Sequence, residues 1–118
     1  MRRRVDFLAA QRVGRRVHLR HWVVLVRRRP GDGGDQLGPR LGVTVSKRVG
    51  NAVQRNRAKR LARECFRQQR ATLHPACDYV WVARRTAPGL TLVDVLQDFT
   101  AHQGALAQAP RRPMRERG

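Results

Sequence analysis

The stretch from Val45 to Arg70 constrains the fold most, because it combines an abrupt start with a two-sided residue pattern. Gly50 interrupts the chain, and Asn51 followed by Gln54 has the spacing of a helix-capping pair. At about 100° per residue, the apolar side chains fall on one side of such a helix. These apolar residues are Ala58, Leu61, Ala62, Cys65 and Phe66. The stretch therefore predicts a helix that packs one side on a core.

The other side of this predicted helix is basic and polar. The stretch holds nine Lys or Arg and a single acid, Glu64. A solvated helix face usually alternates charges of opposite sign at i, i+4, whereas this face places like charges at those spacings. Such self-repulsion is best tolerated when a polyanion supplies the counter-charge. The pattern favours a nucleic-acid-binding face, and a merely solvated face is the alternative.

Composition agrees with one folded domain that attracts polyanions. The chain has 118 residues, 41% of them hydrophobic, and a formal net charge of +18. That charge predicts attraction to phosphate polymers or anionic membranes. No apolar run has the length of a membrane span, and the N-terminal MRRRVDFLAA lacks the apolar core of a signal peptide. A cytoplasmic protein is expected, and Cys65 is expected to be a small buried thiol.

The segments before the basic helix predict one helix and two strands. Residues 5–11 are expected to form a short helix, and residues 17–28 a long strand that is bulged or split. Residues 29–40 are rich in Gly and Pro and predict a surface connection. Residues 41–46 alternate in polarity as a strand does. The two strands are expected to pair as an antiparallel hairpin.

The segments after the basic helix predict a third strand and a final helix. In residues 78–83, Val80 and Val82 share one face, with Tyr79 and Trp81 on the other. Thr91 is expected to cap the last helix. Its packing stripe is Leu92, Val95, Leu96, Phe99 and Leu106. The order of elements predicts an α/β sandwich, with a crossover through the basic helix that places 41–46 and 78–83 in one sheet.

A contiguous block at the start of the basic helix resembles the signature of the bacterial ribonuclease P protein component. The block reads Ser46-Lys47-Arg48-Val49-Gly50-Asn51-Ala52-Val53, then Arg55-Asn56-Arg57 and Lys59-Arg60. Asp6-Phe7, Gly14, Leu41-Gly42-Val43 and Asp78-Tyr79-Val80 extend the resemblance over about residues 4–108. We therefore expect residues 1–108 to form that domain and residues 109–118 to be a disordered basic tail.

The resemblance implies an α+β fold with a small mixed sheet of about four strands and three helices. It also implies a left-handed βαβ crossover through the basic helix, against the usual hand. The function implied is that of an RNA-binding subunit of ribonuclease P, an endonuclease (a hydrolase) that removes the 5′ leader from precursor tRNA. The implied partners are the catalytic RNA and precursor tRNA, with no membrane and no small-molecule substrate. Cleavage would reside in the RNA with Mg²⁺ held mainly by RNA, and the protein alone would bind no cofactor or metal.

The resemblance also implies which residues form the site, namely those that match positions of the family's motif. The residues implied to contact the catalytic RNA are Lys47, Arg48, Asn51, Arg55, Asn56, Arg57, Lys59, Arg60, Arg63 and Arg67. Phe7 matches an aromatic position of the cleft that holds the leader. Trp22 is a second candidate for that cleft, as a surface on which bases stack, and a core position is the equal alternative. Gln11 and Leu25 stand where the family often has aromatic residues.

No constellation in the sequence predicts catalysis by the protein itself. The acids are scattered over different elements, whereas a two-metal nuclease needs carboxylates that converge on ions about 4 Å apart. His18 and His21 are three residues apart on the expected strand and should point to opposite faces. Three hypotheses remain: a ribonuclease P subunit, a general or ribosomal-type RNA-binding protein, and an autonomous nuclease, which the missing site disfavours.

Overall fold

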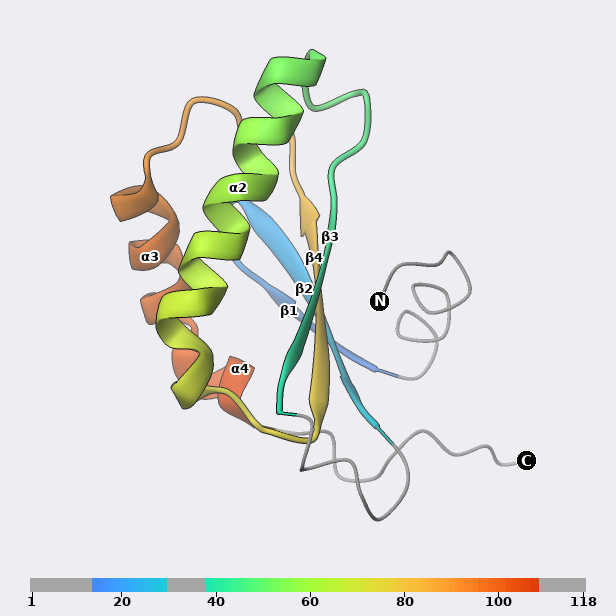
Figure 1. The fold of residues 1–118 in the computed structure, drawn as a ribbon, viewed down its shortest axis with the longest axis vertical. Helices are drawn as coiled ribbons and strands as arrows, with labels where there is room; N and C mark the ends of the chain where they lie inside the picture. The colour runs from blue at the N-terminus through green and yellow to red at the C-terminus, as the bar shows by residue number, and fades with distance from the viewer. Residues whose placement is uncertain (1–13, 30–37, 109–118) are drawn as a thin grey trace, which may run out of the picture.

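Four strands form one mixed sheet in the order β1-β2-β4-β3 (Figure 1). The computed structural model describes residues 14–29 and 38–108. The strands are β1 (Arg15–His18), β2 (Trp22–Arg28), β3 (Arg40–Thr44) and β4 (Cys77–Ala83). β1 pairs antiparallel with β2, β2 pairs antiparallel with β4, and β3 pairs parallel with β4.

The predicted strand over 17–28 is split, and the predicted hairpin with the next strand is wrong. The chain reverses between β1 and β2, where the amide of Leu19 donates to the carbonyl of Trp22 at 2.8 Å. β4, rather than β3, lies beside β2. β4 buries apolar side chains on both faces, which a central strand can do and an edge strand cannot. β3 is exposed at both of its ends and takes the edge.

The helices cover one face of the sheet (Figure 1). They are α2 (Ala52–Gln69), the short 3₁₀ helix η2 (Arg70–Thr72), α3 (Leu92–Ala101) and α4 (Gln103–Ala107). The chain passes from β3 through α2 to the parallel strand β4, so the predicted crossover is confirmed. The predicted α+β sandwich with its small mixed sheet is also confirmed, and the hand of the crossover stays a prediction. The predicted final helix divides into α3 and α4 at His102.

The main core lies between this face of the sheet and the helices. The rings of Trp22 and Trp81 meet edge to face with centroids 5.4 Å apart, and Trp81 stacks on Phe99 at 6.1 Å. The hydroxyl of Tyr79 donates to the carbonyl of Leu106 at 3.0 Å and so fastens α4 to β4. These contacts join two central strands to the C-terminal helices.

Both cysteines are free and buried in this core, as predicted for Cys65. Burial raises the pKa of the Cys65 thiol to about 12 and that of the Cys77 thiol to about 11. Both thiols are therefore protonated at neutral pH, and they serve as small apolar side chains.

Three expectations lie outside the described residues: the helix over 5–11, most of the surface connection over 29–40, and the basic tail over 109–118.

Candidate nucleic-acid interface

The start of α2 is fixed by the predicted capping pair. The amide of Gln54 donates to the side-chain oxygen of Asn51 at 2.8 Å, and the amide of Asn51 donates to the side-chain oxygen of Gln54 at 2.9 Å. The buried side of the helix consists of Ala58, Ala62, Cys65 and Phe66, with Leu61 half-buried beside them. The two-sided helix predicted from the sequence is confirmed, and its orientation sets which arginines face solvent.

We call five residues the basic face of α2, because each is exposed and its side chain makes no hydrogen bond within the described part of the chain. They are Lys47, Arg48, Asn56, Arg60 and Arg63. Lys47 and Arg48 lie in the turn that precedes the helix, and the other three lie on the helix side opposite the core. Four like charges thus stand together without an acid among them, which is the electrostatic footprint of a phosphate-binding surface.

The remaining residues predicted to contact RNA differ from these five. The Nη1 of Arg55 donates to the carbonyl of Gly50 at 2.8 Å, and the Nη2 of Arg57 donates to the carbonyl of Leu90 at 2.8 Å. Asn51 uses its side-chain oxygen as a helix cap. These three side chains therefore stabilise the fold. Asn51 and Arg57 are also exposed, whereas Arg55 and Lys59 are half-buried.

Arg67 differs because it is paired with the acid of the same helix. Its guanidinium donates to both carboxylate oxygens of Glu64, with Nε 3.1 Å from Oε1. The side-chain hydrogen bond from Arg67, together with one from Gln68, lowers the pKa of Glu64 to about 2. Arg67 is thus partly neutralised within the protein.

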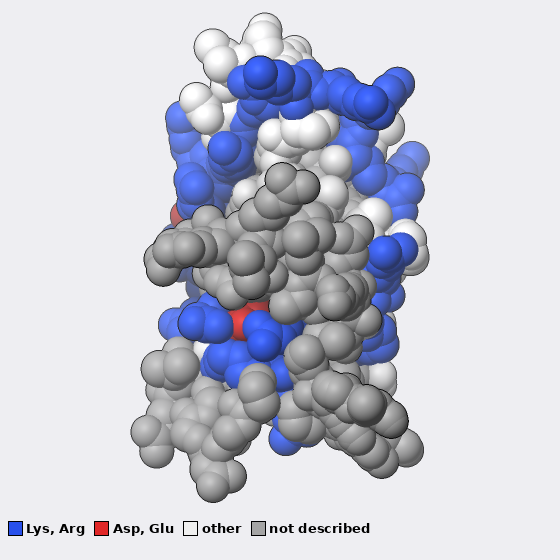
Figure 2. Space-filling view, turned by 90° about the vertical axis from the view of Figure 1, so that its right-hand side faces the viewer, with Lys and Arg blue, Asp and Glu red and all other residues white. Residues whose placement is uncertain are grey.

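A second surface lies on the sheet face that points away from α2, and we call it the second face of the sheet. Strand register and the alternation of side chains place three cross-strand rows on it. The first row is Arg27, Asp78 and Arg40; the second is Arg16, Leu25, Val80 and Gly42; the third is His18, Val23, Val82 and Thr44. Figure 2 views the molecule from this side and shows Lys and Arg atoms along its top and right-hand side, and around a patch of acid atoms in the lower middle.

Two of these rows form an apolar floor, and the first row is charged. Leu25 and Val80 are buried, and Val23 and Val82 pack beside them. Gly42 contributes no side chain next to Val80. The predicted faces of 78–83 are confirmed, since Val80 and Val82 lie here and Tyr79 and Trp81 lie in the main core. Leu25 and Val80 are closed to a ligand, so Val23 and Val82 are the accessible apolar part of this face. An accessible apolar surface and a row of guanidiniums on one face suit the bases and the phosphates of a single strand.

The charged row is centred on the fully buried carboxylate of Asp78. Its Oδ1 accepts from Arg29 Nη1 at 2.6 Å and from Arg40 Nε at 2.8 Å, and its Oδ2 accepts from Arg40 Nη2 at 2.8 Å. Arg27 Nη1 lies 3.8 Å from Oδ2. Burial by itself would raise the pKa of Asp78, but the hydrogen bonds and charges of Arg40 and Arg29 outweigh it and hold that pKa below its usual value.

The interpretation of Trp22 as a base-stacking surface is wrong. Trp22 is 0% exposed and its ring packs against Trp81 in the main core, so no base can reach it. The core alternative is confirmed. Phe7, the other predicted cleft residue, lies outside the described residues.

The histidines have separate structural partners. His18 ends β1 and its Nδ1 is 3.2 Å from Arg84 Nη2, whereas His21 lies in the following turn with its Nδ1 2.8 Å from the hydroxyl of Thr86. The prediction that both stand on one strand is therefore wrong. Nδ1 of His102 lies 2.9 Å from the carbonyl oxygen of Asp98. Among residues 14–29 and 38–108, no group of three or more His, Cys, Asp or Glu is placed to hold a metal ion.

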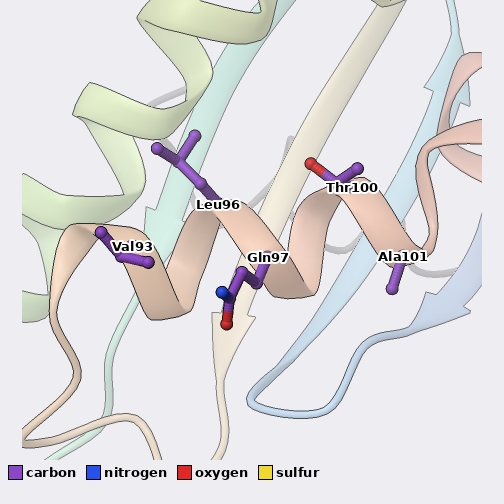
Figure 3. A pocket seen from close by; sticks show the side chains of 5 residues that line it. All are labelled: Val93, Leu96, Gln97, Thr100 and Ala101. Atoms are coloured by element: carbon purple, nitrogen blue, oxygen red, sulfur yellow. The ribbon is translucent and has the colours of Figure 1, made fainter.

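The outer side of α3 carries a different kind of surface. Val93, Leu96, Gln97, Thr100 and Ala101 line a shallow hollow of about 460 Å³ (Figure 3). None of these side chains is charged, and residues 86–108 contain no Lys or Arg. This flank lacks the cations that a phosphate backbone requires. Within the parts of the chain that the structure covers, no helix is both long and apolar enough to span a membrane.

Comparison with known proteins gives one consistent result. A family model described as Ribonuclease P matches residues 1–106. The ribonuclease P protein component of Shouchella clausii (strain KSM-K16) is 46% identical over 90 residues, which cover 76% of this chain and 70% of the relative. That of Syntrophus aciditrophicus (strain SB) is 35% identical over 99 residues, covering 84% of this chain and 79% of the relative.

Solved structures agree with the sequence comparisons. The RNase P protein of Staphylococcus aureus matches with a TM-score of 0.75 and 29% identity, covering 92% of this chain and 94% of that chain. The RNase P protein of Thermotoga maritima matches with a TM-score of 0.75 and 27% identity, covering 91% of this chain and 94% of that chain.

Proposed function

Because the chain belongs to the ribonuclease P protein family, we propose that it binds the catalytic RNA through the basic face of α2 and the 5′ leader of precursor tRNA on the second face of the sheet. Proteins of this family are subunits of ribonuclease P, which processes the 5′ ends of tRNA, and this chain shares that role. The two surfaces lie on different sides of one small domain.

The basic face of α2 is the observation that carries the proposal. The side chains of Arg60 and Arg63 are exposed and make no hydrogen bond within the described residues, and Lys47 and Arg48 extend the same charge past the start of the helix. A guanidinium stays charged at every physiological pH and matches the geometry of a phosphate. The binding energy of such a surface comes largely from released counterions, so it suits the crowded backbone of a folded RNA.

The second face of the sheet supports the assignment to the leader. The half-buried Val23 and Val82 offer bases an apolar surface, and the charged row stands at the other end of the same face. Recognition of a single strand needs both kinds of contact. The resemblance to the family implies a leader-binding role for Phe7, which lies outside the described residues.

In this proposal the protein binds and positions RNA, and the RNA subunit makes and breaks the bonds. Mg²⁺ belongs to the holoenzyme and is held mainly by RNA, and no residue of the protein takes part in the chemical step. Because the protein neutralises phosphates, it lowers the Mg²⁺ concentration at which catalytic RNA and substrate dock productively. We place the assembly in the cytoplasm, where precursor tRNA is made.

Reconstitution tests the proposed function. The protein is added to a bacterial ribonuclease P RNA at a Mg²⁺ concentration that supports little cleavage by the RNA alone, and release of the 5′ leader is measured. We expect a large gain in rate. A preparation that gives no gain at any Mg²⁺ concentration contradicts the proposal. Comparing the affinities of the assembled complex for precursor and mature tRNA then separates a leader-binding subunit, which prefers the precursor, from a general RNA-binding protein, which does not.

A further inference from the structure

We propose that Asp78 is a positioning residue for RNA binding: it fixes the guanidiniums of Arg27 and Arg40 on the second face of the sheet, where they bind backbone phosphates of the single-stranded leader. This inference rests on the proposed function, because it concerns the surface to which we assign the leader. It adds three residues to which the sequence analysis gave no role in binding RNA, and it gives a buried acid a role in binding an anion.

Asp78 is held rigidly from behind. Arg29, which is 7% exposed, donates to the carboxylate and also to three backbone carbonyl groups. Those acceptors are the carbonyls of Cys77 at 3.1 Å, Gly38 at 2.6 Å and Pro75 at 2.8 Å. Arg29 thus ties the ends of β2, β3 and β4 together. With its position set in this way, the carboxylate is a fixed reference point on the sheet.

Arg40 is oriented by that fixed carboxylate while it remains accessible. Its Nε and Nη2 both donate to Asp78 at 2.8 Å, an arrangement that locks the plane of the guanidinium. The side chain is nevertheless 44% exposed. An arginine that is pre-oriented loses less rotamer entropy when it binds a phosphate, so it binds more tightly than a mobile one.

Arg27 lies on the other side of Asp78 from Arg40, and its guanidinium is less well hydrogen-bonded than that of Arg40. Its Nη1 is 3.8 Å from Oδ2, beyond hydrogen-bonding distance, and its side chain is 17% exposed. Its Nε is buried and has no hydrogen-bond partner among the described residues. A guanidinium that lacks hydrogen-bond acceptors in this way is stabilised when a further anion binds to it.

The charge balance of the cluster points the same way. Within residues 14–29 and 38–108, the carboxylate of Asp78 is shared by three guanidiniums, those of Arg27, Arg29 and Arg40. A purely structural ion pair needs only one arginine for each carboxylate. The two partly exposed guanidiniums, those of Arg27 and Arg40, lie on the second face of the sheet, where an extended strand of RNA supplies phosphates.

Replacing Asp78 distinguishes positioning from simple electrostatics, because the two predict opposite signs. Asp78→Asn removes a negative charge from the RNA-binding surface, and simple electrostatics then predicts tighter binding of the leader. Positioning predicts weaker binding, because Arg40 loses a carboxylate that accepts two of its hydrogen bonds. Glu64→Gln makes the same change in net charge at the surface of α2 and serves as the matched control.

The experiment uses the reconstituted holoenzyme and measures Kd for precursor tRNA with a long leader and for mature tRNA. We expect Asp78→Asn to weaken precursor binding by about tenfold, roughly the loss of one charge-assisted hydrogen bond, and to leave mature tRNA binding unchanged. Glu64→Gln is expected not to weaken either. Arg27→Gln and Arg40→Gln should each weaken precursor binding and reduce its salt dependence by about one phosphate.

Arg20→Gln is the control for these two substitutions, since it removes one positive charge from the turn that α3 holds. It should leave the preference for the precursor intact. The Arg27 and Arg40 variants keep the test decisive if Asp78→Asn does not fold, because both side chains are partly exposed. Precursor binding that is equal or tighter in Asp78→Asn, or unchanged in both arginine variants, overturns the inference. A wild-type holoenzyme without any preference for the precursor would instead remove the proposed leader function itself.

Discussion

Arginines that look alike in the sequence have different partners in the structure. Arg60 is exposed and unpaired within the described residues, Arg67 is paired with Glu64, and Arg29 is buried against a carboxylate and three carbonyls. Helical periodicity predicts the side of a helix on which a residue lies. It does not reveal a partner that comes from a distant segment, such as the carbonyl of Leu90 that accepts from Arg57.

This difference predicts unequal effects of substitution on RNA binding. Arg60→Ala should weaken binding of the catalytic RNA and reduce the slope of log K against log salt by about 1, the value for one lost phosphate contact. Arg67→Ala should change that slope much less, because Glu64 already compensates Arg67. Filter binding at several salt concentrations measures both slopes. Equal slopes in the two variants would show that the pair with Glu64 is broken in the complex.

The burial of Trp22 predicts a loss of stability rather than a loss of leader recognition. Trp22→Ala should lower the free energy of unfolding by about 3–5 kcal/mol, because it leaves a large cavity beside Trp81. Urea unfolding followed by circular dichroism measures this cost. In holoenzyme assembled from the folded variant, the ratio of precursor to mature tRNA affinity should match that of the wild type. A variant that keeps full stability and loses that ratio would restore the stacking interpretation.

The lowered pKa of Asp78 predicts a defined acid sensitivity. The folded-state pKa of this group lies below the value of about 3.9 expected in an unfolded chain. Its contribution to stability is therefore fully present above that unfolded value and is lost as the pH falls through the folded value. Wild type should lose stability below about pH 4 more steeply than Asp78→Asn. Parallel unfolding curves for the two proteins between pH 5 and pH 2, set for example at half-unit steps, would contradict this expectation.

At the scale of elements, local signals were predicted well and strand pairing was not. The caps of α2 and α3 were predicted because a capping box lies within four consecutive residues, Asn51 to Gln54 and Thr91 to Asp94. The neighbour of β2 depends on β4, which lies about fifty residues further along the chain. With β3 wrongly placed beside β2, the row of Arg27, Asp78 and Arg40 could not be recognised from the sequence.

The cap of α2 predicts how Asn51 acts. Asn51→Ala should lower the free energy of unfolding by about 0.5–2 kcal/mol, whereas Asn51→Ser keeps a capping oxygen and should cost less. If Asn51 supports RNA binding only through the helix, the catalytic RNA should bind the Ser variant as it binds wild type. Thermal unfolding and RNA affinity are measured on both variants. Weak RNA binding by a stable Ser variant would instead show a direct contact by the amide.

At the scale of the whole molecule, the charge is distributed unevenly. The chain carries 26 Lys and Arg against 8 Asp and Glu, yet residues 86–108, which include α3 and α4, contain no Lys or Arg. In the part of the chain that the structure describes, most cations lie on α2, on the turn before it and around the second face of the sheet. The RNA should therefore meet the protein from the α2 and sheet sides and leave the outer side of α3 uncovered.

This distribution predicts a steep dependence of assembly on salt. A protein with ~6–10 phosphate contacts loses about 10³–10⁵ in affinity between 50 and 200 mM salt. Affinity for the catalytic RNA, measured over that range, should fall by such a factor. Glutamate substitutions at Val93 and Thr100 on the outer side of α3 are the control, since they should change the affinity little. A large effect of these two substitutions would place RNA on α3.

Because both native thiols are buried, introduced cysteines can be used to map which parts of the RNA lie near the protein. Cys65 and Cys77 are buried and hold their protons at neutral pH, so an alkylating or photo-crosslinking reagent would react with them slowly. A new cysteine placed at an exposed position, such as Arg60 or Thr100, would react first without removal of the native pair. Each such probe would label the RNA nearest to it, and a set of them would trace the path of both RNAs across the protein.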